Sequence, residues 1–366
     1  MAQNVSRAFQ KMSEGIEIIE SVLEGENPKL RLVDGKKDED DEDVFIGWHY
    51  CFVEVQRQVK SAKDVHDALD NKLKAMADPE QVKSFIFSYI ESAEKFFQGL
   101  TGVVENIKSD SQYYEVIGIC GLTRVVWPLV VAASAHGLLD GACELPNGRK
   151  LSLLRLIQLV DKLHKVGKFQ GQPLVSLAYD LYNDRDSVDK AIKQMVEYHQ
   201  LWNNRGYTLI ERVKPEEDYF DYLLFSYALH CEGDVSVERL RDFRRMRLRA
   251  VKVLTKYDDT IVRRHGFGRH KDFNEGINYV GNYILVAGAR NIREQQEGDD
   301  GVSPARLKDL VSDSGKLVLA DTKFQLDQID GGLPDMGVNR GSIEARTQEI
   351  EEFLDESWEI LEAECE

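Results

Sequence analysis

The sequence predicts an all-α protein, a multi-helix, two-lobed bundle with a C-terminal helical arm. Three observations support this fold class. Only eight prolines occur in 366 residues, apolar residues recur every three or four positions through most of the chain, and the alternating β-branched runs that form strands are few. A hydrophobic content of 42% with 9% aromatic residues is typical of a folded globular chain.

We expect the chain to be organised in three segments. Residues 1–110 would form an N-terminal helical lobe, residues 111–296 a central and C-terminal helical lobe, and residues 297–366 a linker with an acidic arm. The last boundary is indicated by the polar stretch EGDDGV. Ser303 and Pro304 follow it, and a cap residue with a first-turn proline is typical of a new helix.

The N-terminal lobe is predicted to contain three helices and an acidic loop. An amphipathic helix at 4–24 precedes the acidic loop 26–43, which ends in six consecutive acids. This loop lacks the alternating ligands and distal glutamate of a calcium loop, so we interpret it as a solvated loop. Two long helical patterns follow at 44–76 and 79–109, and Pro79, after an aspartate, is a good start signal for the second.

The central lobe is predicted to contain a buried helix at 116–139, kinked at Pro128. This stretch is long enough for a membrane span, but Arg124 and His136 lie inside it, and polar groups are costly in lipid. We therefore expect no membrane association. The segment CELPNGRK has an Asn-Gly step typical of a tight turn and predicts a small hairpin. Further helices are expected at 151–166, 174–182, 187–203, 216–231 and 273–296.

The stretch 237–271 differs from the rest of the chain, because it holds twelve Lys or Arg against four acids in a protein of net charge −17. Residues 237–257 are predicted to form one basic helix, whose apolar positions, among them Leu240 and Phe243, recur every three or four residues. Five cations on the opposite side would form a ridge about 22 Å long, at roughly 1.5 Å per residue. The ridge consists of Arg241, Arg245, Arg249, Lys252 and Lys256.

The loop 258–271 is predicted to bind an anion. Gly266 and Gly268 allow consecutive backbone N–H groups to face a phosphate, and Phe267 between them offers a ring on which a base could stack. The alternative is a structural loop with ordinary solvated charge. The cationic candidates in this loop are Arg263, Arg264, Arg269 and Lys271.

The last 25 residues, 342–366, contain ten acids and one arginine, a net charge of −9. The ridge and loop from 239 to 271 hold twelve cations and three acids, a net charge of +9. Apolar residues such as Ile350 and Trp358 predict that the tail is a docking helix. We expect it to dock on the ridge, in the same subunit or in a neighbour, and docking on a neighbour would build rings or filaments.

Composition disfavours several kinds of site. The five cysteines form no Cys-x-x-Cys pair and have no histidine pair beside them, so we predict no disulfide framework, no metal and no cofactor. The N-terminus lacks the apolar core of a signal peptide, and we expect a cytoplasmic location, with the nucleus or a virion as alternatives. A pI near 5.0 argues against a surface wholly coated by nucleic acid and leaves room for one basic groove.

Two short patterns resemble catalytic motifs. Asn183, Asp184 and Ser187 resemble part of the magnesium-binding triad of terpene cyclases, but Ala191 occupies the third position. An arginine and a histidine in RRHGFGRH resemble the motif of HEPN-type ribonucleases, but the two glycines between them would interrupt a helix. We therefore predict that the protein is not an enzyme.

We interpret the chain as a non-enzymatic, self-assembling helical protein that binds RNA or single-stranded nucleic acid through a basic groove. It would form homo-oligomers through its C-terminal arm. This organisation resembles that of helical viral nucleoproteins, which clamp RNA between α-helical lobes and exchange terminal arms, so the resemblance implies a capsid or nucleocapsid role. Two alternatives stay open: an acidic scaffold whose ridge binds an acidic protein segment or its own tail, and a helical enzyme with an unrecognised site.

Overall fold

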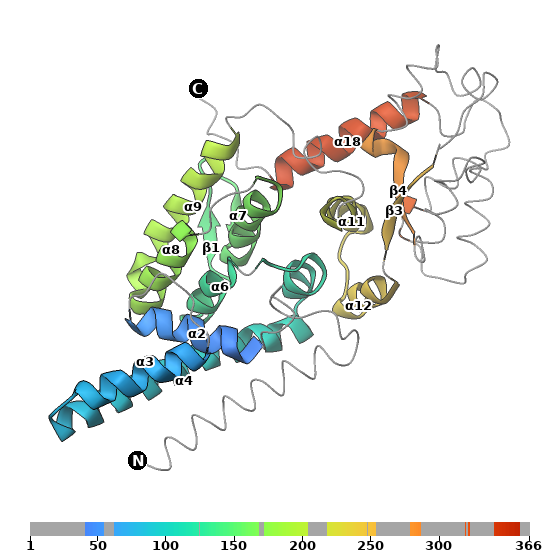
Figure 1. Cartoon of the computed structure of the whole chain (residues 1–366). Coiled ribbons are helices and arrows are strands. Elements are labelled where there is room, and N and C mark those ends of the chain that lie inside the picture. The colour runs from blue at the N-terminus through green and yellow to red at the C-terminus, as the bar shows by residue number, and fades with distance from the viewer. Residues whose placement is uncertain are drawn as a thin grey trace. The chain divides into compact units, whose positions relative to one another are not determined.

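The computed structural model is mostly helical (Figure 1), and the predicted all-α class is confirmed, because the strands of its described part form two short antiparallel pairs. The chain divides into two compact units. The N-terminal unit is Met1–Asn204 with Ile360–Glu366, and the C-terminal unit is Arg205–Glu359. The three segments expected from composition have other boundaries than these two units, and they stay a prediction. The structure describes residues 41–54, 62–123, 125–167, 172–203, 218–246, 248–253, 279–286, 319, 321–322 and 340–358.

The described part of the N-terminal unit begins with α2 (Asp41–Glu54), α3 (Ala62–Ala75) and α4 (Pro79–Ser109). Helix α4 begins at the predicted proline. The Asp78 side chain caps the helix by accepting a hydrogen bond from the Glu80 N–H at 3.0 Å. The fully buried residues of α4 all lie in its second half, from Phe96 to Ile107.

The stretch expected to be one kinked helix at 116–139 is divided, so this prediction is wrong. The short helix α5 (Ser111–Tyr113) precedes it, and the stretch itself holds most of the π-helix η1 (Tyr114–Cys120) and then α6 (Trp127–Ser134). Gly121 has a left-handed φ of 67°, which ends η1. Pro128 lies in the first turn of α6, where a missing N–H costs no helical hydrogen bond. The predicted burial is confirmed, since nearly all of α6 is buried.

A small hairpin follows α6, as the Asn-Gly step predicted. In it β1 (Ala142–Glu144) pairs antiparallel with β2 (Lys150–Ser152). Gly148 in the turn has a φ of 78°, which glycine adopts without strain.

Three longer helices complete the described part of this unit. They are α7 (Leu153–Gly167), α8 (Gln172–Asn183) and α9 (Val188–Asn203), with the short 3-10 helix η2 (Arg185–Ser187) before α9. Each lies within a few residues of its expected bounds. Helix α6 packs on both α4 and α8, while α7 packs on α9, so the core lies between these helices and includes Trp127, Leu156 and Leu177.

Helix α11 (Asp218–Glu232) lies at the centre of the described part of the C-terminal unit. The other elements are α12 (Val237–Met246), β3 (Arg249–Lys252), η3 (Val280–Asn282), β4 (Tyr283–Val286) and α18 (Arg340–Trp358). Strands β3 and β4 pair antiparallel, and α11 contacts both strands and α18. Within this unit, α18 and α12 lie on different sides of α11 (Figure 1).

Two of the helix predictions for this unit are partly wrong. The basic helix expected over 237–257 ends at Met246, and the next described element is strand β3. Strand β4 lies inside the helix expected at 273–296. Paired residues such as Val251 and Ile284 are far apart in the sequence, so no local pattern indicates their pairing. Short apolar runs fit either a helix or a strand, and β-branched residues favour the strand once a partner is present.

Several expectations fall on residues outside the described ranges. The helix at 4–24, most of the acidic loop 26–43 and the helix expected from Ser303 lie there. Helix α2 begins at Asp41 and therefore includes the last residues of the predicted loop. Among the described helices, none has the length and apolar content needed to cross a bilayer.

Candidate functional site

Helix α12 directs arginines away from the core because its apolar side is buried. Val237, Leu240 and Phe243 are buried, and the Phe243 ring meets Phe225 of α11 edge-on, with 5.8 Å between the ring centroids. The other sides of the helix carry four arginines and two acids. The arginines are Arg239, Arg241, Arg244 and Arg245.

Acidic side chains interrupt the predicted ridge on α12. The Arg245 side chain is 60% exposed and lies 3.5 Å from the Asp242 carboxylate. Glu238 is also exposed. Hydrogen bonds from its own N–H and from Ser236, together with the charge of Arg241, lower the pKa of Glu238. Four arginines against two acids give α12 a formal net charge of +2, so its exposed side carries both signs.

Arg249 anchors β3 to α11 instead of continuing a helical ridge. Its Nη1 donates to Asp221 Oδ2 at 2.7 Å, and Asp221 Oδ1 accepts from the Ala250 N–H at 2.7 Å. The Asp221 side chain is 8% exposed, against 39% for Arg249, so this carboxylate depends on both donors. At the other end of the strand, the Lys252 ammonium lies 5.7 Å from the centroid of the Tyr283 ring.

The four described members of the predicted ridge lie on two elements, Arg241 and Arg245 on α12 and Arg249 and Lys252 on β3. Arg239 and Arg244 also lie on α12 but are not members of the predicted ridge, which contains only the cations on one side of the longer helix expected from the sequence. Arg239 Nη2 donates to Glu232 Oε2 at 2.6 Å, which ties the start of α12 to the end of α11. The other predicted site residues lie outside the described ranges: Lys256, Arg263, Arg264, Phe267, Arg269 and Lys271.

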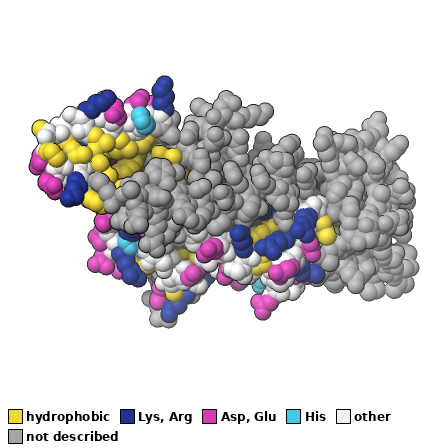
Figure 2. Space-filling view, turned by 90° about the horizontal axis from the view of Figure 1, so that it is seen from below, with side chains coloured by type: hydrophobic (Ala, Val, Ile, Leu, Met, Phe, Trp, Pro, Cys, Tyr) yellow, Lys and Arg dark blue, Asp and Glu magenta, His cyan; other side chains and the backbone are white. Residues whose placement is uncertain are grey.

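We define the basic surface as Arg241, Arg244, Arg245 and Lys252, described cations of α12 and β3 that are at least partly exposed. On the face drawn in Figure 2, Lys and Arg side chains gather in a group beside hydrophobic ones, with Asp and Glu side chains nearby. Arg249 is left out of the definition because Asp221 holds it.

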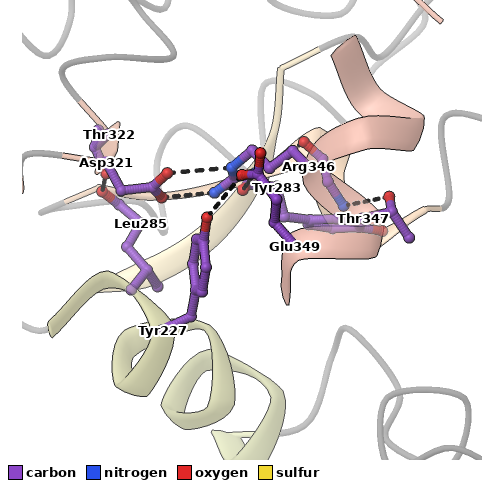
Figure 3. Close-up of polar contacts among 9 residues, drawn as sticks. Tyr227, Tyr283, Leu285, Asp321, Thr322, Arg346, Thr347 and Glu349 are labelled. Carbon is purple, nitrogen blue, oxygen red and sulfur yellow. Dashed lines mark hydrogen bonds and ion pairs between the residues drawn. The ribbon is translucent and has the colours of Figure 1, made fainter. Parts of the chain in front are cut away.

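A buried ion pair holds the C-terminal helix α18 in its own unit (Figure 3). Arg346 Nη2 donates to Asp321 Oδ2 at 2.6 Å and Arg346 Nε to Asp321 Oδ1 at 3.2 Å. The two side chains are 3% and 6% exposed. Arg346 Nη1 also donates to the carbonyls of Gly281 and Tyr283, at 2.8 and 2.6 Å. The buried charge is therefore matched by a carboxylate and by two backbone acceptors.

Further contacts fix α18 at its C-terminal end and near its middle. Trp358 Nε1 donates to Ser226 Oγ of α11 at 3.2 Å, and its ring meets Tyr222 edge-on at 5.6 Å. At η3, the Gly281 N–H donates to Thr347 Oγ1 at 3.0 Å. This segment forms the predicted helix, and its apolar side is buried within its own unit against α11 and η3. Its docking on the ridge stays a prediction.

The solvent-facing side of α18 is acidic. Its inner side buries Ile343, Arg346 and Ile350, whereas the exposed charged side chains described on this helix are all carboxylates. We define them as the acidic surface: Glu344, Glu349, Glu352, Asp355 and Glu356.

A polar cluster in the N-terminal unit joins α2, α4 and α8. His49 Nε2 lies 3.1 Å from Ser92 Oγ, which lies 3.1 Å from the Tyr182 hydroxyl. Such a Ser–His contact can activate a nucleophile. Burial lowers the pKa of His49 to about 3, and the residue is 2% exposed, so a substrate has little access to the imidazole. We interpret the cluster as a packing network.

Lys95 extends this network to the turn that follows α6. Its Nζ lies 2.9 Å from His136 Nε2 and donates to the Tyr182 carbonyl at 2.9 Å. Burial lowers the pKa of Lys95. These contacts tie α4 and α8 to the turn after α6.

Thiol and metal chemistry have little support in the described ranges. There, no group of His, Cys, Asp and Glu side chains is arranged to hold a metal ion. Burial raises the pKa of Cys143 to about 11 and also raises that of Cys120. Both side chains are therefore protonated thiols at neutral pH, which are poor nucleophiles.

Comparison with known proteins finds no matching family model, no similar curated protein and no similar solved structure.

Proposed function

We propose that the protein binds RNA or single-stranded nucleic acid, without catalysis, through the basic surface of its C-terminal unit. One observation carries this proposal: residues 237–253 hold seven Lys or Arg and two acids in a chain of net charge −17. The burial of Val237, Leu240 and Phe243 supports it, because it leaves the arginines of α12 on the outside.

The chemistry of the surface favours phosphate over base recognition. Arginine forks form paired hydrogen bonds with phosphate oxygens, and phosphate contacts carry no sequence information. The proposed binding is therefore expected to be tolerant of sequence. Arg245 is the best candidate for a direct contact, since its side chain is 60% exposed. Arg249 is assigned a supporting role, because it neutralises Asp221.

Titration of a labelled oligouridine at several salt concentrations tests the proposal. For single strands, the logarithm of the binding constant falls with a slope of about −0.7 per neutralised phosphate. Combining Arg241→Glu, Arg244→Glu and Arg245→Glu is expected to weaken binding at least about tenfold and to reduce the slope by about 2. Arg249 is kept, because its replacement would leave the Asp221 carboxylate without its guanidinium partner.

A matched control separates a local site from the effect of net charge. Lys63→Glu, Lys74→Glu and Lys83→Glu make the same change in charge at exposed positions of α3 and α4 in the N-terminal unit. This control is expected to bind nearly as wild type. If the α12 variant is folded and binds with wild-type affinity and salt slope, the proposal is wrong.

An acidic protein segment is a second candidate for the same surface. The exposed carboxylates of α18 favour this candidate, since they show that the chain itself contains a helix whose charge is opposite to that of the basic surface. The ultraviolet absorbance spectrum of freshly purified protein helps to separate the candidates, because copurified nucleic acid is visible in it and a protein partner is not.

A further inference from the structure

Helix α18 keeps one orientation within the C-terminal unit because it is anchored in its first half and at its C-terminal end. Toward its N-terminal end, the buried Arg346–Asp321 pair and the close contact with η3 hold it. At its C-terminal end, Trp358 is 2% exposed and donates to Ser226. These two anchors prevent the helix from rolling, so the acidic surface stays toward solvent.

The acidic and basic surfaces lie on different sides of α11. Helix α18 contacts α11 and η3, whereas α12 joins α11 through the Phe225–Phe243 ring pair, and Figure 1 draws the two helices apart within this unit. While both anchors hold, α18 cannot neutralise the basic surface of its own unit. The sequence left open whether the tail docks in the same subunit or in a neighbour, and this arrangement disfavours the same subunit.

We propose that the acidic surface of α18 in one copy docks on the basic surface of α12 and β3 in a second copy. Each copy offers one surface of each sign, so the contact is heterologous and repeats head to tail, which gives a closed ring or an open filament. This assembly does not require nucleic acid. It uses the same basic surface as the proposed function, so a second copy and a nucleic acid strand compete for it.

The contact is weak per ion pair and sensitive to salt. Exposed ion pairs contribute about 0–1 kcal/mol each, and charge complementarity mainly raises the association rate and selects the partner. Screening acts over a Debye length of about 10 Å at 0.1 M salt. Association is therefore concentration dependent at low salt and lost at high salt.

Sedimentation velocity on nuclease-treated full-length protein, at about 0.05 M and about 0.5 M salt, tests the contact without nucleic acid. A base-reversed variant combines Arg241→Glu, Arg244→Glu and Arg245→Glu. An acid-reversed variant combines Glu352→Arg, Asp355→Arg and Glu356→Arg. At low salt, each variant alone is expected to self-associate at least about tenfold more weakly than wild type, because like charges meet at every junction.

Mixing the two variants is the decisive step. In the mixture, the reversed α18 meets the reversed α12, and the two unchanged surfaces meet each other, so every junction between unlike copies joins opposite charges. Association is expected to return to the wild-type level, in assemblies that contain both variants. The Lys63, Lys74 and Lys83 control carries the same charge change as the base-reversed variant and is expected to associate like wild type on its own.

Three outcomes overturn the proposal. They are a wild type that stays monomeric at both salt concentrations, folded variants that associate like wild type, and a mixture that does not recover. Circular dichroism establishes that each variant is folded. The two proposals also fail separately: recovery in the mixture with no binding of oligouridine overturns only the nucleic-acid proposal, and the converse overturns only the head-to-tail contact.

Discussion

Arg346 and Asp321 form a two-bonded ion pair inside the C-terminal unit, with N···O distances of 2.6 and 3.2 Å and side chains 3% and 6% exposed. Arg346 belongs to α18, in the segment that its composition alone describes as an acidic tail. The positive charge of Arg346 is paired with Asp321 inside the unit, so it does not neutralise the carboxylates on the outer side of α18. One buried pair thus both anchors α18 and leaves its outer side acidic.

Breaking this pair is expected to be far more costly than breaking an exposed one. Arg346→Met leaves the Asp321 carboxylate buried without its partner, so the free energy of unfolding of the C-terminal unit should fall by about 3–5 kcal/mol. Arg245→Met, which removes the exposed contact with Asp242, should cost about 0–1 kcal/mol. Urea unfolding measures both changes.

A double substitution tests whether the cost comes from unpaired charge. Combining Arg346→Met with Asp321→Leu removes both charges, and it should destabilise the unit less than Arg346→Met alone. Equal losses in the single and double variants would mean that packing and the two carbonyl contacts of Arg346 dominate. That result would contradict our account of the pair.

Replacing Gly281 with a residue that has a side chain is expected to destabilise the C-terminal unit. A Cβ at this position would overlap the Ile343 carbonyl oxygen and come within 2.7 Å of the Thr347 backbone nitrogen. Gly281→Ala must therefore push η3 away from α18, at a cost of about 1–3 kcal/mol. Hydrogen exchange should show faster exchange in α18, and unchanged protection there would contradict the prediction.

Replacing two glycines of α4 with alanine should change the stability of the N-terminal unit in opposite directions. At Gly99 a Cβ would lie 2.8 Å from the Ala135 backbone nitrogen, next to the end of α6, whereas at Gly102 its nearest neighbour would be Ser134 Oγ at 3.6 Å. Gly99→Ala should destabilise the N-terminal unit by about 1–3 kcal/mol. Gly102→Ala should stabilise it by about 0.5–1 kcal/mol, because alanine loses less backbone entropy in a helix. Thermal unfolding distinguishes the two.

His49 should make the N-terminal unit sensitive to acid. Burial holds its folded-state pKa at about 3, below the ordinary value of 6.5. As the pH falls below 6.5, only the unfolded chain binds the proton at this site, so stability falls with pH and stops falling near pH 3. At about pH 5 the loss should be about 2 kcal/mol.

Replacing the imidazole tests this assignment. His49→Gln removes the titrating group, so its free energy of unfolding should change less between about pH 7 and about pH 5 than that of wild type, by about 2 kcal/mol. The exposed His66 provides the control, since His66→Gln should keep the wild-type pH dependence. An unchanged pH profile for His49→Gln would assign the acid sensitivity to other groups.

Local signals were enough for much of the fold. Asp78 and Pro79 predicted the start of α4, since capping and a first-turn proline involve neighbouring residues only. The Asn-Gly step predicted the hairpin for the same reason. The spacing of Leu240 and Phe243 predicted which side of α12 is buried. Local signals did not predict the length of α12. The chain after this helix forms strand β3, whose pairing partner is the distant strand β4.

The sequence by itself determined the all-α class, most helix starts and the separation of charge between residues 237–271 and the tail. Only the tertiary structure decided that the predicted ridge is part helix and part strand, that Asp221 holds Arg249, and that Arg346 is buried with Asp321. The physical reason is distance along the chain. Helix periodicity and caps depend on residues within a few positions of each other, whereas the partner of a buried charge or a strand can lie anywhere in the sequence and is chosen by packing.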